Sequence, residues 1–206
     1  TVIKIAEIVD DCPVTKIGRY CFYQGPKERT IEKVTIPSTV EEIGEKAFND
    51  CSNLNTVEFA PNSQLKILGK HAFSDCKKLS KIVIPKSVER IEAWAFGLCS
   101  KLENIAFEMR EKPISIEPSA FIGCPFCNIT FPHNVEFGKD SLSNAVNLKT
   151  LTFTGPGEIK KENILKFLPY DGAGNFFKYN IEKLFDGQVS MQIGGKLTID
   201  LWGGYL

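Results

Sequence analysis

The sequence has no excess charge of either sign, no long apolar run and almost no histidine. Its 206 residues carry 25 Lys and Arg against 25 Asp and Glu, and residues 155–206 are balanced too, with six of each sign. Nucleic-acid binding needs surplus basic residues to contact phosphates. A transmembrane helix needs a run of about 18 apolar residues, which is missing here. We therefore expect no nucleic-acid partner and no membrane insertion.

A short phrase containing Ile, Ala-Phe and Cys recurs along the chain. Clear copies occupy residues 43–51, 68–76, 91–99 and 116–124, and variant copies begin at residues 17 and 137. The variants have Gly25 and Ala145 at the cysteine position, and the last copy has Leu142 in place of Phe. The starts are 26, 25, 23, 25 and 21 residues apart. Six copies at this period predict a leucine-rich-repeat solenoid.

A second phrase of the form L-x-x-V-x-F follows each copy. It occupies Ile31–Ile36, Leu54–Phe59, Leu79–Ile84, Leu102–Phe107, Phe126–Phe131 and Leu148–Phe153. Its period-two alternation predicts a short strand, and a proline directly after three of the copies ends the strand. The A-F phrase predicts a short helical or 3₁₀ turn. Since one repeat cannot bury its own apolar residues, the repeats are expected to stack and pair their strands in parallel.

The combined pattern I-G-x-x-A-F-x-x-C-x-x-L-x-x-I-x-I-P resembles the BspA-like leucine-rich repeats, over roughly residues 14–154 and best over residues 43–91. This family is found in surface and secreted proteins of bacteria and some protozoan parasites. The resemblance implies a binding or adhesion role at the cell surface or outside the cell, with no shared catalytic residues. Unpaired cysteines would equally suit a reducing cytosol, and the first four residues lack the pattern of a signal peptide.

We predict an α/β fold in the form of a right-handed leucine-rich-repeat solenoid of about six repeats. A short parallel sheet would line its concave face. Residues 1–16 are expected to form an N-terminal cap or partial repeat, with a strand covering the first edge, and residues 17–154 the solenoid. Residues 155–206 break the period and are expected to form a C-terminal cap or an appended α+β subdomain. In this segment we predict helices over 159–168 and 175–185, and a hairpin over 188–201 around Gly194 and Gly195.

Four cysteines, Cys51, Cys76, Cys99 and Cys124, occupy one position in consecutive repeats. Equivalent Cβ atoms should stay near the strand spacing of about 4.8 Å, whereas a disulfide needs about 3.8 Å. We therefore expect a buried ladder of thiols. Cys124 and Cys127 form a C-x-x-C motif, which is typical of redox pairs and half zinc sites. No second motif accompanies it, so we expect neither a metal nor a cofactor.

The outward strand positions are the best candidates for a binding site, because solenoids use such surfaces as extended platforms. They form two columns: Lys33, Thr56, Lys81, Asn104, Asn128 and Thr150, and Thr35, Glu58, Val83, Ala106, Thr130 and Thr152. These side chains are small and mildly charged, which favours a flat protein or glycan surface over a small-molecule pocket. The strand propensity of Thr and Val explains the same composition equally well.

The leading hypothesis is a non-enzymatic module that binds a protein or glycan through the concave strands. A second hypothesis is a structural spacer that presents the C-terminal segment or a further domain. A third, less favoured, is an enzyme with a site in residues 155–206, where the sequence shows no nucleophile beside a base.

Overall fold

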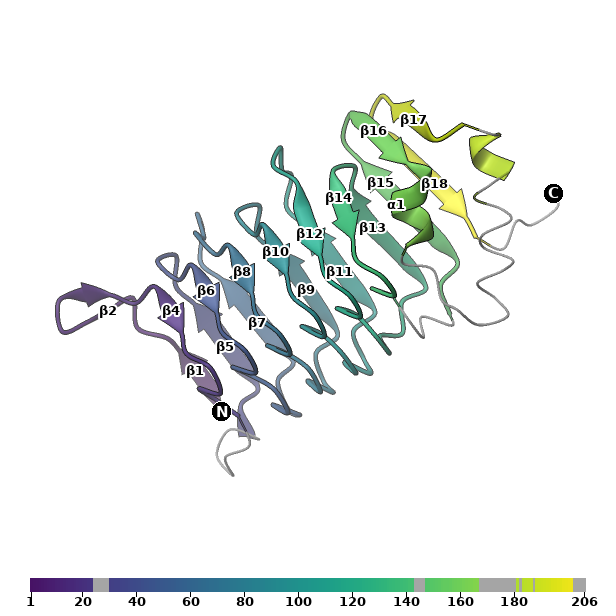
Figure 1. Ribbon diagram of the computed structural model, residues 1–206. Helices are drawn as coiled ribbons and strands as arrows, with labels where there is room; N and C mark the ends of the chain where they lie inside the picture. Colours follow the sequence, from purple (N-terminus) through teal and green to yellow (C-terminus); the bar gives the residue numbers. More distant parts are fainter. Residues whose placement is uncertain (24–29, 143–146, 167–180, 182, 187, 202–206) are drawn as a thin grey trace.

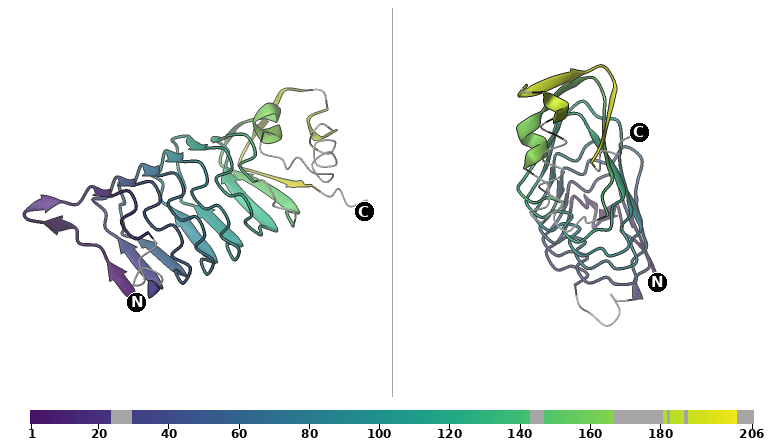
Figure 2. Two further views of the ribbon diagram at one scale, coloured as in Figure 1. Left: turned by 60° about the horizontal axis from the view of Figure 1, so that its bottom comes forward. Right: turned by 90° about the vertical axis from the view of Figure 1, so that its right-hand side faces the viewer.

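A computed structural model of the chain describes residues 1–23, 30–142, 147–166, 181, 183–186 and 188–201. It is a parallel β-solenoid of about six turns with little helix, as predicted (Figure 1). Each turn places one strand in a first sheet and a shorter strand in a second sheet, and the apolar core lies between the two sheets. The N-terminal strands and the C-terminal strands lie at opposite ends of the stack (Figure 2).

The first sheet contains the six strands that the L-x-x-V-x-F phrases predict. They are β5 (Lys33–Ile36), β7 (Thr56–Phe59), β9 (Lys81–Ile84), β11 (Asn104–Phe107), β13 (Asn128–Pro132) and β15 (Thr150–Thr154). Two terminal strands extend this sheet: β1 (Val2–Lys4) pairs in parallel with β5, and β18 (Lys196–Asp200) pairs antiparallel with β15.

The second sheet is a feature that the sequence analysis missed. Its strands are β4 (Lys16–Ile17), β6 (Glu42–Ile43), β8 (Ile67–Leu68), β10 (Arg90–Ile91), β12 (Ile114–Ile116) and β14 (Val135–Phe137). All of them pair in parallel in one six-stranded sheet. Strands of two or three residues are too short to show a period-two alternation, which is why the pattern did not indicate them.

The A-F phrases form turns, as predicted, and contain i→i−3 hydrogen bonds of the 3₁₀ type, such as Ala47 N to Gly44 O at 3.2 Å, but they form no continuous helix. Alternate backbone amides point along the stack: Phe48 N donates to Ala72 O at 2.8 Å, and Phe73 N donates to Ala95 O at 2.7 Å. Because the next repeat satisfies every second amide, the internal hydrogen bonds do not continue as a helix. Left-handed residues recur in these turns. One set, with φ between 55° and 61°, comprises Tyr20, Lys46, His71, Trp94, Ser119 and Asp140, and a second set four residues later comprises Asp50, Asp75, Leu98 and Gly123.

The core is built from columns of identical side chains. Phe22, Phe48, Phe73, Phe96 and Phe121 stack with ring centroids 4.9–5.5 Å apart and interplanar angles of 3–9°. All but Phe22 are fully buried. The four aligned cysteines are buried next to this stack, and none of the seven cysteines, all of which are described, forms a disulfide. The predicted thiol ladder is therefore confirmed.

The N-terminal segment covers the first edge only in part. Val2–Lys4 pairs with β5 as expected. Ile8 and Val9 do not continue this strand, because β2 (Ile8–Val9) folds back on β3 (Cys12–Pro13) as a separate antiparallel hairpin. This hairpin projects from the end of the stack and leaves both apolar side chains exposed (Figure 1, purple).

The C-terminal segment differs from the sequence prediction in its pairing. The helix expected over 159–168 is shorter, because β16 (Gly157–Lys160) precedes α1 (Lys161–Leu165). The expected hairpin is wrong: β17 (Ser190–Ile193) pairs with β16, whereas β18 pairs with β15. The turn at residues 194–195 thus connects two different sheets. Most of the helix expected over 175–185 lies outside the described residues. Within the described ranges, no helix has the length and apolarity to cross a bilayer.

Candidate binding surface

The two predicted columns are aligned by the strand register of the first sheet. Lys33 pairs with Thr56, Lys81 with Asn104, and Asn128 with Thr150. The second column follows the same registers two residues later in each strand. Buried residues such as Val34, Ile82 and Ile129 alternate with these positions. The column residues therefore face away from the core, as the alternation predicts.

Exposure varies along the columns. Glu58, Lys81, Val83, Asn104, Ala106, Asn128 and Thr130 are exposed, while Lys33, Thr35, Thr56 and Thr150 are half-buried. Thr152 is only 8% exposed, so the prediction that its side chain is accessible on this face is wrong. Its strand pairs with β18, and its hydroxyl group lies 3.1 Å from that of Thr198. The accessible face therefore ends at Thr130 and Thr150.

Polar contacts on this face cross between strands. Lys33 Nζ donates to Glu58 Oε1 at 2.6 Å, and Thr150 Oγ1 donates to Asn128 Oδ1 at 2.7 Å. The side chains of the Lys33–Glu58 pair are 36% and 50% exposed, so solvent screens the pair and it contributes little to stability. Val83 is 53% exposed and lies beside Lys81 on the outer face. The centre of the face thus combines an apolar methyl surface with charges of both signs.

The sheet is divided into three parts. Its strands begin at residues 33, 56, 81, 104, 128 and 150, so the spacings are 23, 25, 23, 24 and 22 residues. The strand pairing is interrupted between β7 and β9 and between β11 and β13, where the two longest spacings occur. The connections after β7 and β11 have seven and six residues, compared with five after β5 and β9. Each interruption therefore follows one of the two longest connections.

Each interruption, called a seam below, leaves a hollow on the outer face. The first, of about 460 Å³, is lined by Thr56, Glu58, Lys81 and Val83, together with Phe59 and Glu108. The second, of about 470 Å³, is lined by Ala106 and Thr130, together with Phe107 and Phe131. Six of the predicted residues therefore border these two seams, and the face is less flat than the sequence indicated. Each hollow offers aromatic surface below a polar rim.

The C-x-x-C motif has no geometry suited to redox chemistry. Cys124 is fully buried and its thiol donates to Phe96 O at 3.2 Å, whereas Cys127 is exposed. Burial raises the pKa of Cys124 well above its usual value, and a redox thiol needs a lowered pKa. Within the described residues, no three or more His, Cys, Asp or Glu side chains are grouped to hold a metal ion.

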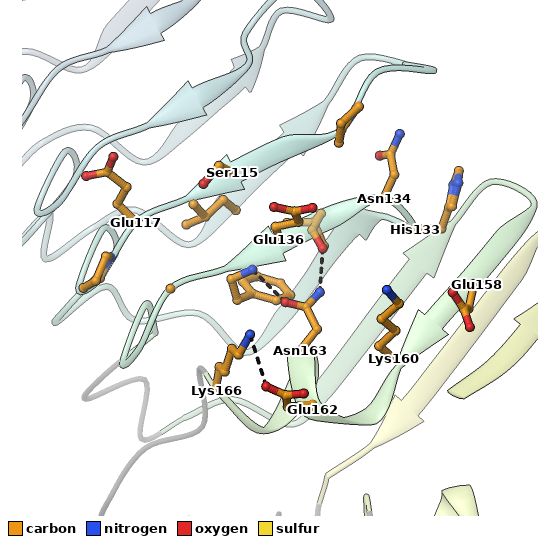
Figure 3. Close-up of a pocket in the computed structure, with 16 residues that line it drawn as sticks. Ser115, Glu117, His133, Asn134, Glu136, Glu158, Lys160, Glu162, Asn163 and Lys166 are labelled. Carbon is orange, nitrogen blue, oxygen red and sulfur yellow. Dashed lines mark hydrogen bonds and ion pairs between the residues drawn. The ribbon is translucent and has the colours of Figure 1, made fainter. Parts of the chain in front are cut away.

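A polar cavity of about 610 Å³ lies between β14, α1 and β16 (Figure 3). Asn163 connects α1 to β14, because its Nδ2 donates to Val135 O at 2.6 Å and its Oδ1 accepts from Phe137 N at 2.8 Å. Figure 3 shows Glu136, Glu158 and Lys160 around the opening. Ser115 is the one hydroxyl-bearing side chain among its described lining residues, and no described base bonds to it.

Comparison with known proteins decides the family. A model of the BspA type Leucine rich repeat region matches residues 15–149 and 106–164, with six copies. The chain belongs to the BspA-type leucine-rich-repeat family. This match covers the predicted solenoid and extends into α1.

Solved structures of bacterial proteins show the same fold. The pneumococcal vaccine antigen PcpA is 27% identical with a TM-score of 0.63, over 74% of this chain and 40% of that one. A leucine rich cell surface protein from Faecalibacterium prausnitzii is 26% identical with a TM-score of 0.53, over 79% of this chain and 50% of that one. A leucine-rich repeat protein from Eubacterium ventriosum, 23% identical over 75% and 40% of the two chains, supports the fold alone, with a TM-score of 0.58.

The chain spans half or less of the length of each of these three structures. A search of curated proteins finds no match. The comparisons therefore assign the family and the general character of an interaction module.

Proposed function

We propose that the chain is a non-enzymatic module that binds a protein or glycan partner through the outer face of the first sheet, at the cell surface or outside the cell. The family supports an interaction role, and one similar structure is described as a cell surface protein. The surface itself is the main support, because its residues are in register within each of the pairs β5–β7, β9–β11 and β13–β15.

The central observation is the seam between β7 and β9. There Glu58, Lys81 and Val83 border a hollow whose floor includes Phe59. A protein partner could place an apolar side chain in the hollow and pair its charges with the rim, as interface cores and rims do. A glycan could contact the same aromatic floor with a sugar ring. Neither partner requires a nucleophile, a metal or a cofactor.

A capture experiment with matched variants tests this proposal. The parent chain is immobilised and exposed to extracellular and cell-surface protein and glycan pools. The test variant carries Lys81→Glu and Thr130→Arg, which change one exposed residue at each seam. The control carries Lys78→Glu and Ser100→Arg, the same introduced side chains at exposed turn positions outside the strands. All three chains must unfold at the same denaturant midpoint.

We expect the parent and the control to capture the same partner, and the test variant to lose at least about tenfold in affinity from a reversed charge and a blocked hollow. Equal capture by the test variant would contradict the proposal and would indicate a binding site outside the strand face. Capture of nothing by the parent would also contradict it, in favour of the spacer hypothesis.

A further inference from the structure

A further cavity lies among the loops that follow strands of the first sheet. It measures about 1010 Å³ and is lined by Ser63, Gln64, Lys66, Lys86, Ser87, Glu89, Met109, Arg110, Glu111, Lys112, His133, Gly155 and Pro156. These residues come from the loops after β7, β9, β11, β13 and β15. The β11–β12 loop rises above its neighbours and forms one wall (Figure 1). The cavity shares no residue with the two strand columns.

Arg110 is the central cation of this cavity. Its guanidinium group is half-buried: Nε donates to Lys112 O at 3.0 Å, and Nη2 donates to Val88 O and Pro113 O. These bonds fix the plane of the group. Its Nη1 atom is buried and has no hydrogen-bond partner in the described part of the chain. Glu89, whose charge acts on Arg110, is paired with Lys112 at 3.5 Å.

Two more buried polar atoms without a partner in the described residues lie in this region. Ser87 Oγ belongs to a residue that lines the same cavity. Asn134 Oδ1 belongs to a residue that lines the neighbouring cavity of Figure 3 and not this one, and Asn134 Nδ2 donates to Glu111 O at 2.7 Å. Together with Arg110 Nη1, these are all the buried side-chain polar atoms without a partner in the described ranges. Leaving such atoms unpaired costs free energy, so the presence of Arg110 and Ser87 in one cavity lining indicates a place built for polar ligand atoms.

The other lining groups limit the ligand class. Lys66 is held by Glu41 at 2.6 Å and Lys112 by Glu89, while Lys86 brings a further positive charge. Gln64 and Glu111 offer acceptors for hydroxyl groups. Met109, which is 95% exposed, and Pro156 offer apolar contact. A ligand that matches this mixture has one anionic group, several hydroxyl groups and a compact carbon skeleton.

We propose that this cavity binds an acidic saccharide, a hexuronic or sialic acid unit, whose carboxylate pairs with Arg110 and Ser87. Arginine with fixed geometry is well suited to recognise a planar carboxylate. Sugar hydroxyl groups both donate and accept, so they suit the mixed acceptors and donors of the rim. A peptide fits less well, because the cavity is walled by loops and offers no strand edge for main-chain pairing. The cavity adjoins the second strand-face hollow, because Met109, Arg110 and Gly155 line both, whereas it shares no lining residue with the hollow between β7 and β9.

The test titrates the whole chain with glucuronate and with glucose, which has the same ring and no carboxylate, and follows backbone amide NMR shifts. Glucuronate should give saturable shifts in residues 86–89 and 108–113, and glucose should bind at least about tenfold more weakly. Affinity for glucuronate should fall as sodium chloride is added, since salt screens the ion pair.

Ser87→Asp provides the decisive variant, because it places a competing carboxylate in the cavity and removes no hydrogen bond between described residues. It should weaken glucuronate binding about tenfold or more, while the control Ser100→Asp at an exposed turn should leave it unchanged. Arg110→Ala should weaken binding similarly, although it also removes the loop hydrogen bonds. The strand-face variant Lys81→Glu, at the hollow that shares no lining residue with this cavity, should bind glucuronate like the parent, so the two proposals can fail separately.

Four results would overturn the saccharide proposal. Glucose could bind as tightly as glucuronate, or glucuronate could produce no saturable shift in these loops. A short Asp- and Glu-rich peptide could bind more tightly than glucuronate, which would identify the cavity as a peptide site. Unchanged binding by Ser87→Asp would also overturn it.

Discussion

The thiol of Cys99 donates a hydrogen bond of 3.1 Å to the backbone carbonyl oxygen of Phe73, one repeat earlier in the stack. Cys51, Cys76 and Cys124 make the same contact with the Phe of the preceding repeat at 3.2–3.3 Å. Each acceptor belongs to a residue of the stacked phenylalanine column. The cysteine position therefore connects neighbouring repeats with a side chain that is both small and a weak donor.

Thiol accessibility should follow this arrangement. Cys12, Cys21 and Cys127 are exposed, and the four column cysteines are buried. A thiol-reactive dye should label the three exposed thiols of the native chain quickly. After unfolding without reductant, it should label all seven. Rapid native labelling of more than three thiols, or far fewer than seven after unfolding, would contradict the buried ladder.

Alkaline pH should destabilise the fold through the same thiols. Burial raises the pKa of Cys76 and Cys124 well above the usual value near 9, and that of Cys99 to about 12. In the unfolded chain these thiols ionise near pH 9, so the unfolded state binds fewer protons above this pH and stability falls with rising pH. Their stabilising contribution is complete below pH 9 and is lost progressively as the pH rises towards 12.

The measurement is the free energy of unfolding in urea between pH 7 and pH 11. The Cys99→Ala variant should start lower, because it loses a buried contact. Its decline above pH 9 should be shallower, because one thiol no longer titrates. A decline of equal slope in the parent and the variant would show that other groups cause it.

The phenylalanine column should be most sensitive in its middle. Phe73 is fully buried between Phe48 and Phe96, with ring centroids 5.1 and 5.5 Å away. Phe73→Ala should destabilise the chain by about 3–5 kcal/mol, the usual cost of such a cavity. Phe22→Ala, at the half-buried end of the column, should cost clearly less. Urea unfolding gives both values, and equal losses would contradict the column as described.

Gly69 should tolerate no side chain, because its backbone approaches the preceding repeat. A Cβ atom at this position would lie 2.7 Å from Ile43 O and 2.8 Å from the carbonyl carbon of Gly44. Gly69→Ala should therefore cost about 1–3 kcal/mol, as overpacking does. The matched substitution Gly18→Ala meets nothing within 4 Å and should be close to neutral. Similar unfolding midpoints for the two variants would disagree with this close packing.

The sequence predicted the long strands well because their inward residues repeat in fixed positions. The alternation through Lys81, Ile82 and Val83 places Lys81 and Val83 on one face, and the shared phrase sets their register with Asn104 and Ala106. The fold followed from the period, since each repeat can bury its apolar residues only against another. The ladder of cysteines followed from the same spacing.

Other features depend on contacts that no local pattern encodes. Thr152 occupies an outward position in the alternation of its strand. It is nevertheless covered by β18, because Thr198, 46 residues later in the sequence, lies beside it. In the sequence, the two seams correspond only to spacings of 25 and 24 residues between successive strands. The effect of these spacings on strand pairing becomes clear only from the hydrogen-bonded pairs in the structure. The grouping of Arg110 with Ser87 arises because loops of successive repeats lie next to one another. Neither residue is part of the repeated phrases.

The most direct test of the account is a photo-crosslink from the strand face to the captured partner. A benzophenone amino acid replaces Val83, which is 53% exposed beside the central seam, or Leu98, which is 46% exposed on a turn. The two positions match in exposure and apolar character but differ in face. The account predicts a crosslink to the partner from position 83 and little or none from position 98. An equal or stronger crosslink from position 98 would contradict binding through the first sheet.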